Sequence, residues 1–517
     1  MLRIRWGLLV CVLTVSAGCA HKVTLEQAPP PPPPPVPAPA PMVVAAPPAD
    51  AGDDPELATS TVHSHWKATP QAPVSTFSID VDTGSYSLSR GMLSDGRLPP
   101  SELVRSEEFL NYFDHDYPQP ASAEPPFAVY SEIAPAPWNP QRYLLQIGIQ
   151  GFDVDQRDLP PANLVFLIDT SGSMQSSDKL PLLKQGFAAL IERLRAEDRV
   201  AIVAYAGSAG LVLPSTAGDQ HRIILAALDA LEAGGSTNGG EGIELAYRVA
   251  NEGRMAGGIN RVILATDGDF NVGTTSIEAL KQLVEQNRSS GTALTTLGFG
   301  RWGYDDQVAE QLADIGDGNH AYIDDQLEAR KVLVKEMGGT LLTIARDVKI
   351  QLEFSPVAVP RYRLIGYTNR LLRREDFAND QVDAGEIGAG HDVTALYELE
   401  LADGLQPQDL LATLRLRYKP ADEQAERREQ SRLIEHRLLA DSLKPTPGPR
   451  LLFAAAVAGF AEKLSGSPEL TTTDFETLAS WAEQSTQGRS HQASDHDERQ
   501  ELLELIRLSQ ALVEAER

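Results

Sequence analysis

The chain has 517 residues, too many for one hydrophobic core, and this length predicts about two or three domains. Its 72 acidic residues outnumber its 45 basic residues, which gives a net charge of -27. Because such a surface repels a phosphate backbone, the charge argues against DNA or RNA as a partner. It is compatible with cation binding, although charge alone does not establish a binding site.

The first twenty residues have the pattern of a secretory signal. A charged start precedes the apolar run Leu8–Val15, which is too short to span a membrane. The residues SAGC then resemble the lipobox of bacterial lipoproteins, in which the cysteine becomes the lipidated first residue, although Ser16 stands where the lipobox prefers Leu. We predict a signal peptide over residues 1–18 and lipidation of Cys19, with ordinary cleavage near Ala20 as the alternative.

A proline-rich stretch follows the signal and contains seven consecutive prolines, Pro29–Pro35. This composition favours polyproline II and cannot build a core. We expect residues 19–72 to form a disordered linker, a stalk that lifts the folded part away from a membrane.

Residues 73–160 are predicted to form an N-terminal flanking domain of α+β type. A short strand, Phe77–Val81, leads into a helix, and the segment SELVRSEEFLNYF has helical spacing with Ser101 as its cap. The segment YLLQIGIQG alternates between polar and apolar residues in the manner of a strand.

From 161 to 345 the patterns alternate between strand and helix. Apolar strands such as NLVFLID, RVAIVAYAG and RVILATDG alternate with amphipathic helical segments. This order predicts an α/β fold with a doubly wound parallel sheet, similar to a Rossmann fold, on which ligands bind beyond the carboxyl ends of the strands. After residue 346 the patterns have period two and then helical spacing, which predicts a C-terminal β-rich domain with a helical tail over 346–517.

Oxygen-bearing side chains lie in three of the loops expected at one edge of this sheet. The stretch LVFLIDTSGSMQ places Asp169, Ser171 and Ser173 at alternate positions after a buried strand. Thr237 lies in GGSTNGG before a predicted helix, and Asp267 ends another strand. Hard divalent cations prefer oxygen ligands, and Mg²⁺ prefers them in a near-octahedral array.

These three segments, in this order, resemble the von Willebrand factor type A domain and its metal-ion-dependent adhesion site. The first segment matches the DxSxS pattern in full. The resemblance implies that Ser171, Ser173 and Thr237 are direct ligands of Mg²⁺, with Mn²⁺ or Ca²⁺ as alternatives. It implies that Asp169 and Asp267 bind the metal directly or through water.

Other residues compete with this assignment or could extend it. Ser236 is an alternative to Thr237, and Asp269 is a candidate for a contact through water. Asp80 and Asp82, in IDVDTGSYS, could form a second cation site, although such a pattern more often marks a turn with a helix cap.

Patterns that would indicate other chemistry are weak or missing. The segment from Asp267 has the oxygens of an EF-hand loop, but its glycine, Gly273, comes one position late and a strand precedes it. The pair His63 and His65 reads as a solvated loop. The sequence has no GxxxxGK[ST] loop and suggests no Ser–His–Asp or Cys–His arrangement, so we expect no enzymatic activity.

The flanking sequences, including TFSIDVDTGSYS, RLIGYTNR and RLRYK, resemble bacterial envelope proteins that carry this domain between dedicated flanking regions. The resemblance implies metal-dependent adhesion or assembly, in which the metal meets an Asp or Glu carboxylate of a partner protein. We expect a lipid-anchored protein at the outer membrane or periplasmic face. The alternatives are a regulatory or scaffolding subunit of an ATPase-type machine, against which the signal argues, and a structural lipoprotein with an idle metal site.

Overall fold

The structure is a computed structural model that describes residues 64–268, 276–300, 307–382, 384–421, 430–486 and 493–515. The predicted signal peptide, Cys19, Asp269 and His63 lie outside the described residues. None of the helices in the described ranges combines the length and apolar character needed to cross a membrane.

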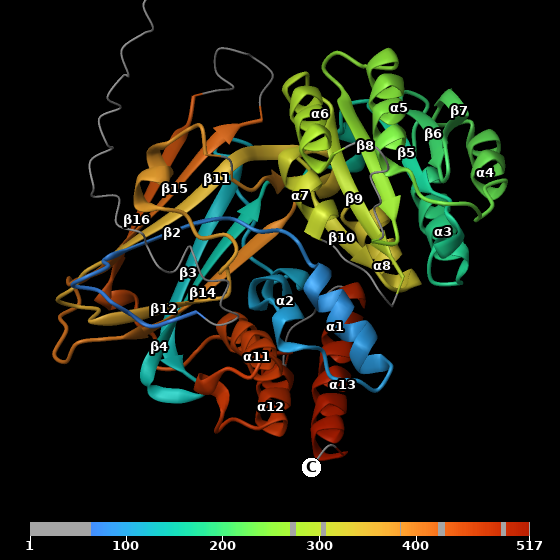
Figure 1. The fold of residues 1–517 in the computed structure, drawn as a ribbon. Coiled ribbons are helices and arrows are strands. Elements are labelled where there is room, and N and C mark those ends of the chain that lie inside the picture. Colours follow the sequence, from blue (N-terminus) through green and yellow to red (C-terminus); the bar gives the residue numbers. More distant parts are fainter. Residues whose placement is uncertain are drawn as a thin grey trace, which may run out of the picture. The chain divides into compact units, whose positions relative to one another are not determined.

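A six-stranded sheet with the strand order β10-β9-β8-β5-β6-β7 forms the centre of the α/β part (Figure 1). Its strands are β5 (Ala162–Asp169), β6 (Arg199–Tyr205), β7 (Ala209–Ala217), β8 (Ile259–Thr266), β9 (Ala293–Phe299) and β10 (His320–Ile323). All neighbouring pairs are parallel except β6 and β7, which are antiparallel. The predicted doubly wound fold is thus confirmed, with an antiparallel edge strand that the sequence patterns did not indicate.

Helices cover both faces of this sheet, which explains why β5 is buried along its whole length. They are α3 (Leu180–Ile191), α4 (His221–Asp229), α5 (Gly239–Glu252), α6 (Ile277–Ser289), α7 (Gln307–Ile315), α8 (Gln326–Arg330) and α9 (Met337–Leu341). Phe166 and Ile168 pack in one core with Phe187 of α3. Val165 and Leu167 point the other way, into a second core with residues of α5 and α6.

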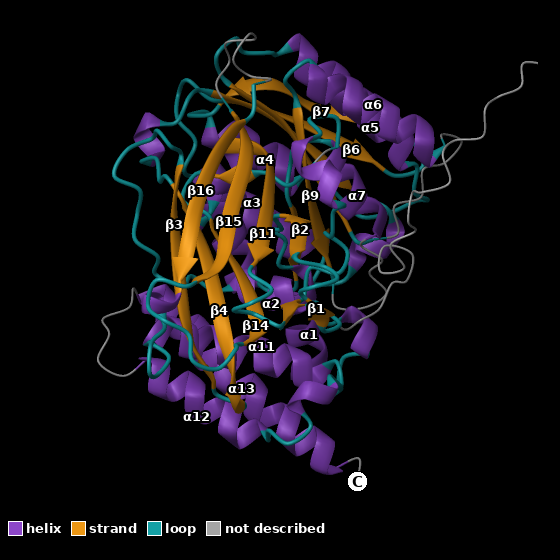
Figure 2. Cartoon of the chain, turned by 90° about the vertical axis from the view of Figure 1, so that its left-hand side faces the viewer, coloured by secondary structure: helices purple, strands orange, loops and turns teal. Residues whose placement is uncertain are grey.

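Two antiparallel five-stranded sheets make up the rest of the β structure (Figure 2). One has the order β1-β12-β14-β4-β3, from Lys67–Ala68, Arg361–Ile365, Asp392–Glu400, Asn139–Gly151 and Phe127–Ala136. The other contains β13 (Ile387–Gly388), β11 (Thr343–Phe354), β15 (Leu410–Pro420), β16 (Arg432–Leu439) and β2 (Val74–Ser78), which pairs with β11. Their apolar residues share one core.

Helices from both ends of the chain pack together beside the first of these sheets. They are α1 (Gly84–Ser94), α2 (Ser106–Tyr112), α11 (Pro449–Leu464), α12 (Phe475–Thr486) and α13 (Ala493–Ala515). Phe109 of α2 and Phe460 of α11 lie in the same core, with ring centroids 6.1 Å apart.

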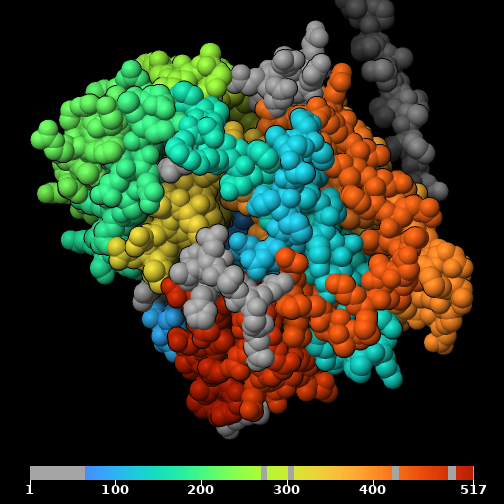
Figure 3. Space-filling model, turned by 180° about the vertical axis from the view of Figure 1, so that it is seen from behind, coloured from blue at the N-terminus to red at the C-terminus, as the bar shows by residue number. Residues whose placement is uncertain are grey.

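The two flanks, predicted as separate domains, are interleaved. Strand β2 precedes the α/β part in the chain and pairs with β11, which follows it, and β4 pairs with β14 in the same way. The space-filling view shows the surface of the β3–β4 region directly beside that of the C-terminal region (Figure 3), where Lys444 contacts Glu132. Both flanks therefore build one unit, and neither has a sheet of its own.

The folded part begins before residue 73, where the sequence analysis ended the linker. Strand β1 pairs with β12, and the Thr69 side chain is fully buried. The Trp66 ring lies 4.6 Å from the guanidinium carbon of Arg142 and 5.2 Å from that of Arg361. These cation–π contacts and the strand pairing hold the start of the described chain on the sheet.

The segment predicted as one helix with Ser101 as its cap is divided in two. A 3₁₀ turn, Ser101–Leu103, is followed by α2, and Arg105 between them is extended. The Ser85 hydroxyl donates to the carbonyl of Leu103 at 2.6 Å and accepts from the backbone N–H of Arg105 at 2.8 Å. A side chain from α1 thus takes the backbone groups that a continuous helix would use.

Candidate metal centre

Asp169 and Asp267 are brought to the same edge of the sheet by two neighbouring parallel strands. Strand β5 pairs with β8 in a register that sets Ile168 opposite Ala265. Asp169 is the last residue of β5, and Asp267 directly follows β8. Both carboxylates are buried, with relative exposures of 0% and 3%.

The loop after β5 turns its hydroxyls toward each other. The backbone N–H of Ser171 donates to Asp169 Oδ1 at 2.7 Å, which fixes the start of the loop. Ser171 itself is extended and precedes the 3₁₀ turn Gly172–Gln175. The Oγ atoms of Ser171 and Ser173 then lie 2.9 Å apart. We call Asp169, Ser171, Ser173 and Asp267 the Asp169 cluster.

The loop that carries Thr237 is tied to the loop after β5 by backbone hydrogen bonds. Gly172 N–H donates to the carbonyl of Gly235 at 3.0 Å, and Gly234 N–H donates to the carbonyl of Thr170 at 2.8 Å. Gly235 has a φ of +90°, a conformation that strongly favours glycine. Thr237 is partly buried in this loop, just before α5.

Ser236, the alternative to Thr237, is exposed. Its hydroxyl faces Gly207 in the loop after β6, where a Cβ would lie 3.1 Å from Oγ. This position favours Thr237 over Ser236 as the third hydroxyl, and that assignment stays a prediction.

Burial dominates the electrostatics of the Asp169 carboxylate. The pKa of Asp169 is raised to about 6, mainly by burial and also by the charge of Asp267, against hydrogen bonds from Ser171 that lower it. Asp169 Oδ2 makes no hydrogen bond of normal geometry in the described part of the chain, although the Tyr205 hydroxyl lies near enough to lower the pKa. Asp267 Oδ1 is buried and also lacks a donor among the described residues.

One cation contacts the Asp169 cluster in the part of the chain that the structure describes. The Lys179 ammonium lies 2.9 Å from Asp267 Oδ2. This lysine could not be predicted from the sequence, because it lies at the start of a helical segment and no local pattern links it to Asp267.

The donor set fits a divalent cation of the hard type. It combines carboxylate and hydroxyl oxygens, and two buried carboxylate oxygens make no hydrogen bond of normal geometry among the described residues. Within the ranges that the structure describes, no group of three His, Cys, Asp or Glu side chains is placed to hold a metal. A metal at this edge would therefore depend on the hydroxyls as well as on the two carboxylates.

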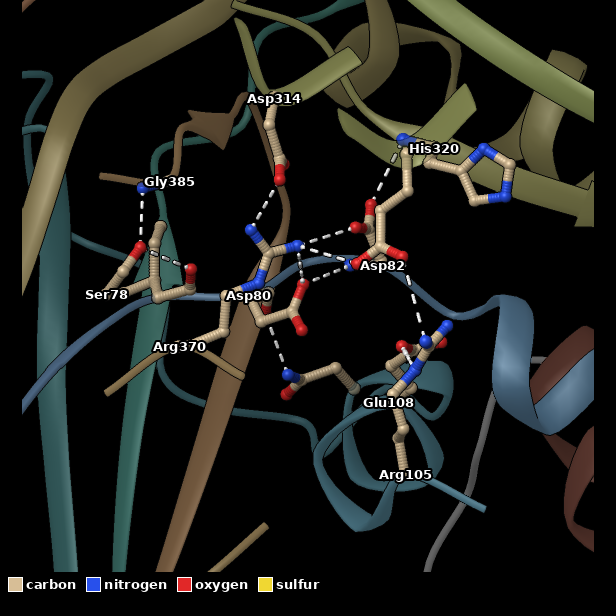
Figure 4. A network of polar contacts seen from close by, with 12 residues as sticks. Ser78, Asp80, Asp82, Arg105, Glu108, Asp314, His320, Arg370 and Gly385 are labelled. Carbon is tan, nitrogen blue, oxygen red and sulfur yellow. Dashed lines mark hydrogen bonds and ion pairs between the residues drawn. The ribbon is translucent and has the colours of Figure 1, made fainter. Parts of the chain in front are cut away.

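Asp80 and Asp82, the candidates for a second cation site, are paired with arginine instead (Figure 4). Arg370 Nη2 lies 3.3 Å from Asp80 Oδ1 and 2.9 Å from Asp82 Oδ2. The same guanidinium contacts Glu310 and Asp314 of α7. We call these five residues the Arg370 cluster.

Backbone groups also bind the two aspartates of the Arg370 cluster. Asp82 N–H donates to Asp80 Oδ1 at 3.1 Å, and His320 N–H donates to Asp82 Oδ1 at 3.0 Å. The first of these hydrogen bonds forms the turn that was the predicted alternative to a cation site. The cluster therefore joins the segment after β2 to α7 and β10 of the α/β part.

Family models match the chain over most of its described length. The von Willebrand factor type A domain matches residues 163–336, and a model described as von Willebrand factor matches residues 57–146. The model described as "Uncharacterized protein YfbK, C-terminal" matches residues 339–512.

Individual proteins extend this likeness. The chain is 28% identical over 296 residues to "Uncharacterized protein sll0103" of Synechocystis sp., covering 55% of this chain and 67% of that protein. A solved structure, "von Willebrand factor type A from Catenulispora acidiphila", covers 69% of this chain and 86% of its own, with 17% identity and a TM-score of 0.40. A von Willebrand factor type A domain suggests a protein-interaction or adhesion module.

The chain is 45% identical over 439 residues to "Uncharacterized protein YfbK" of Escherichia coli (strain K12), covering 81% of this chain and 76% of that protein. The resemblance to the von Willebrand factor type A domain is therefore confirmed. The chain belongs to the YfbK family, with a von Willebrand factor type A domain between its two flanks.

Proposed function

We propose that this protein is a metal-dependent protein-binding module that acts in adhesion or assembly in the bacterial cell envelope. The observation that carries the proposal is the pair of buried oxygens, Asp169 Oδ2 and Asp267 Oδ1, which make no hydrogen bond of normal geometry within the described residues. Leaving buried carboxylate oxygens without compensation is costly, and a divalent cation would supply that compensation.

In this proposal Ser171, Ser173 and Thr237 are the direct ligands of Mg²⁺, with Mn²⁺ or Ca²⁺ as alternatives. Asp169 and Asp267 bind it directly or through water. Neutral hydroxyls do not cancel the charge of the ion, and two carboxylates cancel it only when both bind closely. The metal thus keeps an affinity for a further anionic ligand, and an Asp or Glu of a partner protein has the right chemistry. We assign no catalytic step to this site.

The partner half of the proposal is tested by metal-dependent capture. The full mature chain, purified in detergent and immobilised, is incubated with envelope extract in Mg²⁺ or in EDTA, beside a matched Ser171→Ala protein. We expect a protein that is retained only by the unmodified chain in Mg²⁺. Identical retention under all conditions would contradict metal-dependent binding and favour the alternative, a structural lipoprotein with an idle metal site.

The location half of the proposal rests on the lipobox-like segment before Cys19, which lies outside the described residues. We expect palmitate labelling and membrane association of the unmodified protein, and loss of both in Cys19→Ser. Equal labelling of the two proteins would contradict lipidation at this residue. A cytoplasmic, unlabelled protein would favour the ATPase-associated alternative.

A further inference from the structure

Lys179 lies within the candidate metal centre, next to one of its carboxylates. Its Nζ is 2.9 Å from Asp267 Oδ2, and the side chains of the lysine and the aspartate are 15% and 2% exposed. The other oxygen of the same carboxylate, Oδ1, has no donor in the described part of the chain. Among the described residues, Lys179 is thus the positive charge that the chain brings to Asp267.

Backbone hydrogen bonds and the packing of its side chain fix the position of this lysine. Its backbone N–H donates to the carbonyl of Ser176 at 3.1 Å, and its carbonyl accepts from the N–H of Leu183 at 2.8 Å, at the start of α3. Its aliphatic stem crosses Gly300, directly after β9, where a Cβ would lie 2.5 Å from Lys179 Cε. Gly300 has a φ of +104°, so both its conformation and the closeness of the lysine favour glycine there.

The electrostatic consequence depends on whether a metal is present. Without a metal, the ammonium compensates a buried carboxylate that would otherwise have no counter-charge in the described structure. With a metal, the ammonium adds a like charge close to a divalent ion that needs the same carboxylate. Like charges at such separations repel strongly where water is largely excluded.

We propose that Lys179 is a built-in counter-ion of the metal centre, which stabilises the metal-free protein and opposes the binding of a divalent cation. This inference rests on the function proposed above and adds a means of regulating its metal site. The lysine lowers the affinity for the metal alone and raises the positive charge of the loaded site. Tight loading is then favoured when an anionic partner binds as well.

The test compares variants of the full mature chain with Mn²⁺ as the probe. Lys179→Gln keeps a hydrogen-bond donor without the charge, Lys179→Met removes both, and Lys179→Arg keeps the charge. Lys184→Gln is the matched control, because Lys184 is on α3, which begins directly after Lys179, and its ammonium contacts the carbonyl of Asp229 at 2.8 Å, not a carboxylate. Calorimetry gives the Mn²⁺ affinity, and thermal melts in EDTA give the stability of the metal-free state.

We expect Lys179→Gln and Lys179→Met to bind Mn²⁺ roughly tenfold or more tightly than the unmodified chain, because a repelling charge is removed. Lys179→Arg and Lys184→Gln should bind as the unmodified chain does. In EDTA, Lys179→Met should melt at a lower temperature than Lys184→Gln.

Unchanged or weaker Mn²⁺ binding in both neutral variants would overturn this inference, since it would make Lys179 only an orienting donor for Asp267. An undiminished melting temperature of Lys179→Met in EDTA would overturn the counter-ion role. If Mn²⁺ binding depends on Asp267 but not on Lys179, the proposed function stands alone. If no variant binds Mn²⁺, both fall.

Discussion

The described residues include the Asp169 cluster and the Arg370 cluster, and the buried aspartates of the two differ in what compensates their charge. In the Arg370 cluster one guanidinium contacts both Asp80 and Asp82. In the Asp169 cluster the one lysine contacts Asp267 but makes no described contact with Asp169.

The two clusters also differ in how many of their aspartate oxygens lack a described hydrogen-bond donor. Of the carboxylate oxygens of Asp80 and Asp82, Oδ2 of Asp80 alone lacks a described donor, whereas Asp169 and Asp267 each have such an oxygen. Acidic residues in a short motif therefore do not define a metal site. The cation that the fold places beside them decides between an ion pair and a candidate metal centre.

The largest effect is expected from removing the cation of the Arg370 cluster. Arg370→Met should lower the free energy of unfolding by about 3 kcal/mol or more, because it leaves the buried carboxylates of Asp80 and Asp82 without their shared partner. Chemical denaturation measures the loss. The exposed Arg374→Met is the control and should change stability by less than about 0.5 kcal/mol. Equal stability of the two variants would show that the ion pairs do not hold this cluster together.

The next effect concerns the Asp169 cluster and its metal. Mg²⁺ should bind one site, and Ser171→Ala and Asp267→Ala should weaken it by about tenfold or more without unfolding the protein, because these side chains lie beyond the strand ends. Asp169→Ala should also destabilise the fold, since Asp169 Oδ1 holds the N–H of Ser171. Calorimetry and circular dichroism of each variant separate the two effects.

The control for metal binding is the exposed neighbour Ser177, and Ser177→Ala should bind as the unmodified chain does. If Ser171→Ala and Asp267→Ala bind Mg²⁺ undiminished while Asp80→Asn does not, the metal belongs to the Arg370 cluster. The comparison between the two clusters would then be reversed.

The smallest effect is a pH dependence that belongs to the Arg370 cluster and its neighbours. Burial raises the pKa of Glu310 to about 8, although the charges of Arg105 and Arg370 lower it. Charges on Glu108 and Asp80 raise it. A carboxyl whose folded pKa exceeds its usual 4.5 keeps its proton in the folded protein, so the free energy of unfolding falls as the pH rises from about 4.5 to about 8.

Two further acids, one beside this cluster and one within it, act in the same direction. Burial raises the pKa of Glu107 to about 7, and burial together with the charge of Asp80 raises the pKa of Asp82 well above its usual range. Melts between about pH 5 and pH 8.5 should show Glu310→Gln losing less stability with rising pH than the exposed control Glu285→Gln. Parallel pH curves for the two variants would mean that Glu310 is ionised throughout.

The sequence alone indicated the α/β fold because its strands are local patterns. Continuous apolar runs such as residues 164–168 belong to strands buried on both faces, and the helices between them have amphipathic spacing. The DxSxS motif placed Asp169, Ser171 and Ser173 after such a strand, where the structure brings the two hydroxyls together. Strand β7 was missed because its apolar run, Leu211–Leu213, is short and most of the strand is exposed at a sheet edge.

Only the tertiary structure decided which distant segments meet. The periodicity of apolar residues predicts which side of a helix or strand is buried. It does not predict which strand pairs with which, or which charged residues form an ion pair. The pairing of β2 with β11, the contact of Arg370 with Asp80 and that of Lys179 with Asp267 all join residues far apart in the chain. For the same reason, the break of the predicted helix at Arg105 could not be predicted from the neighbouring residues, because the competing hydroxyl belongs to Ser85 on another helix.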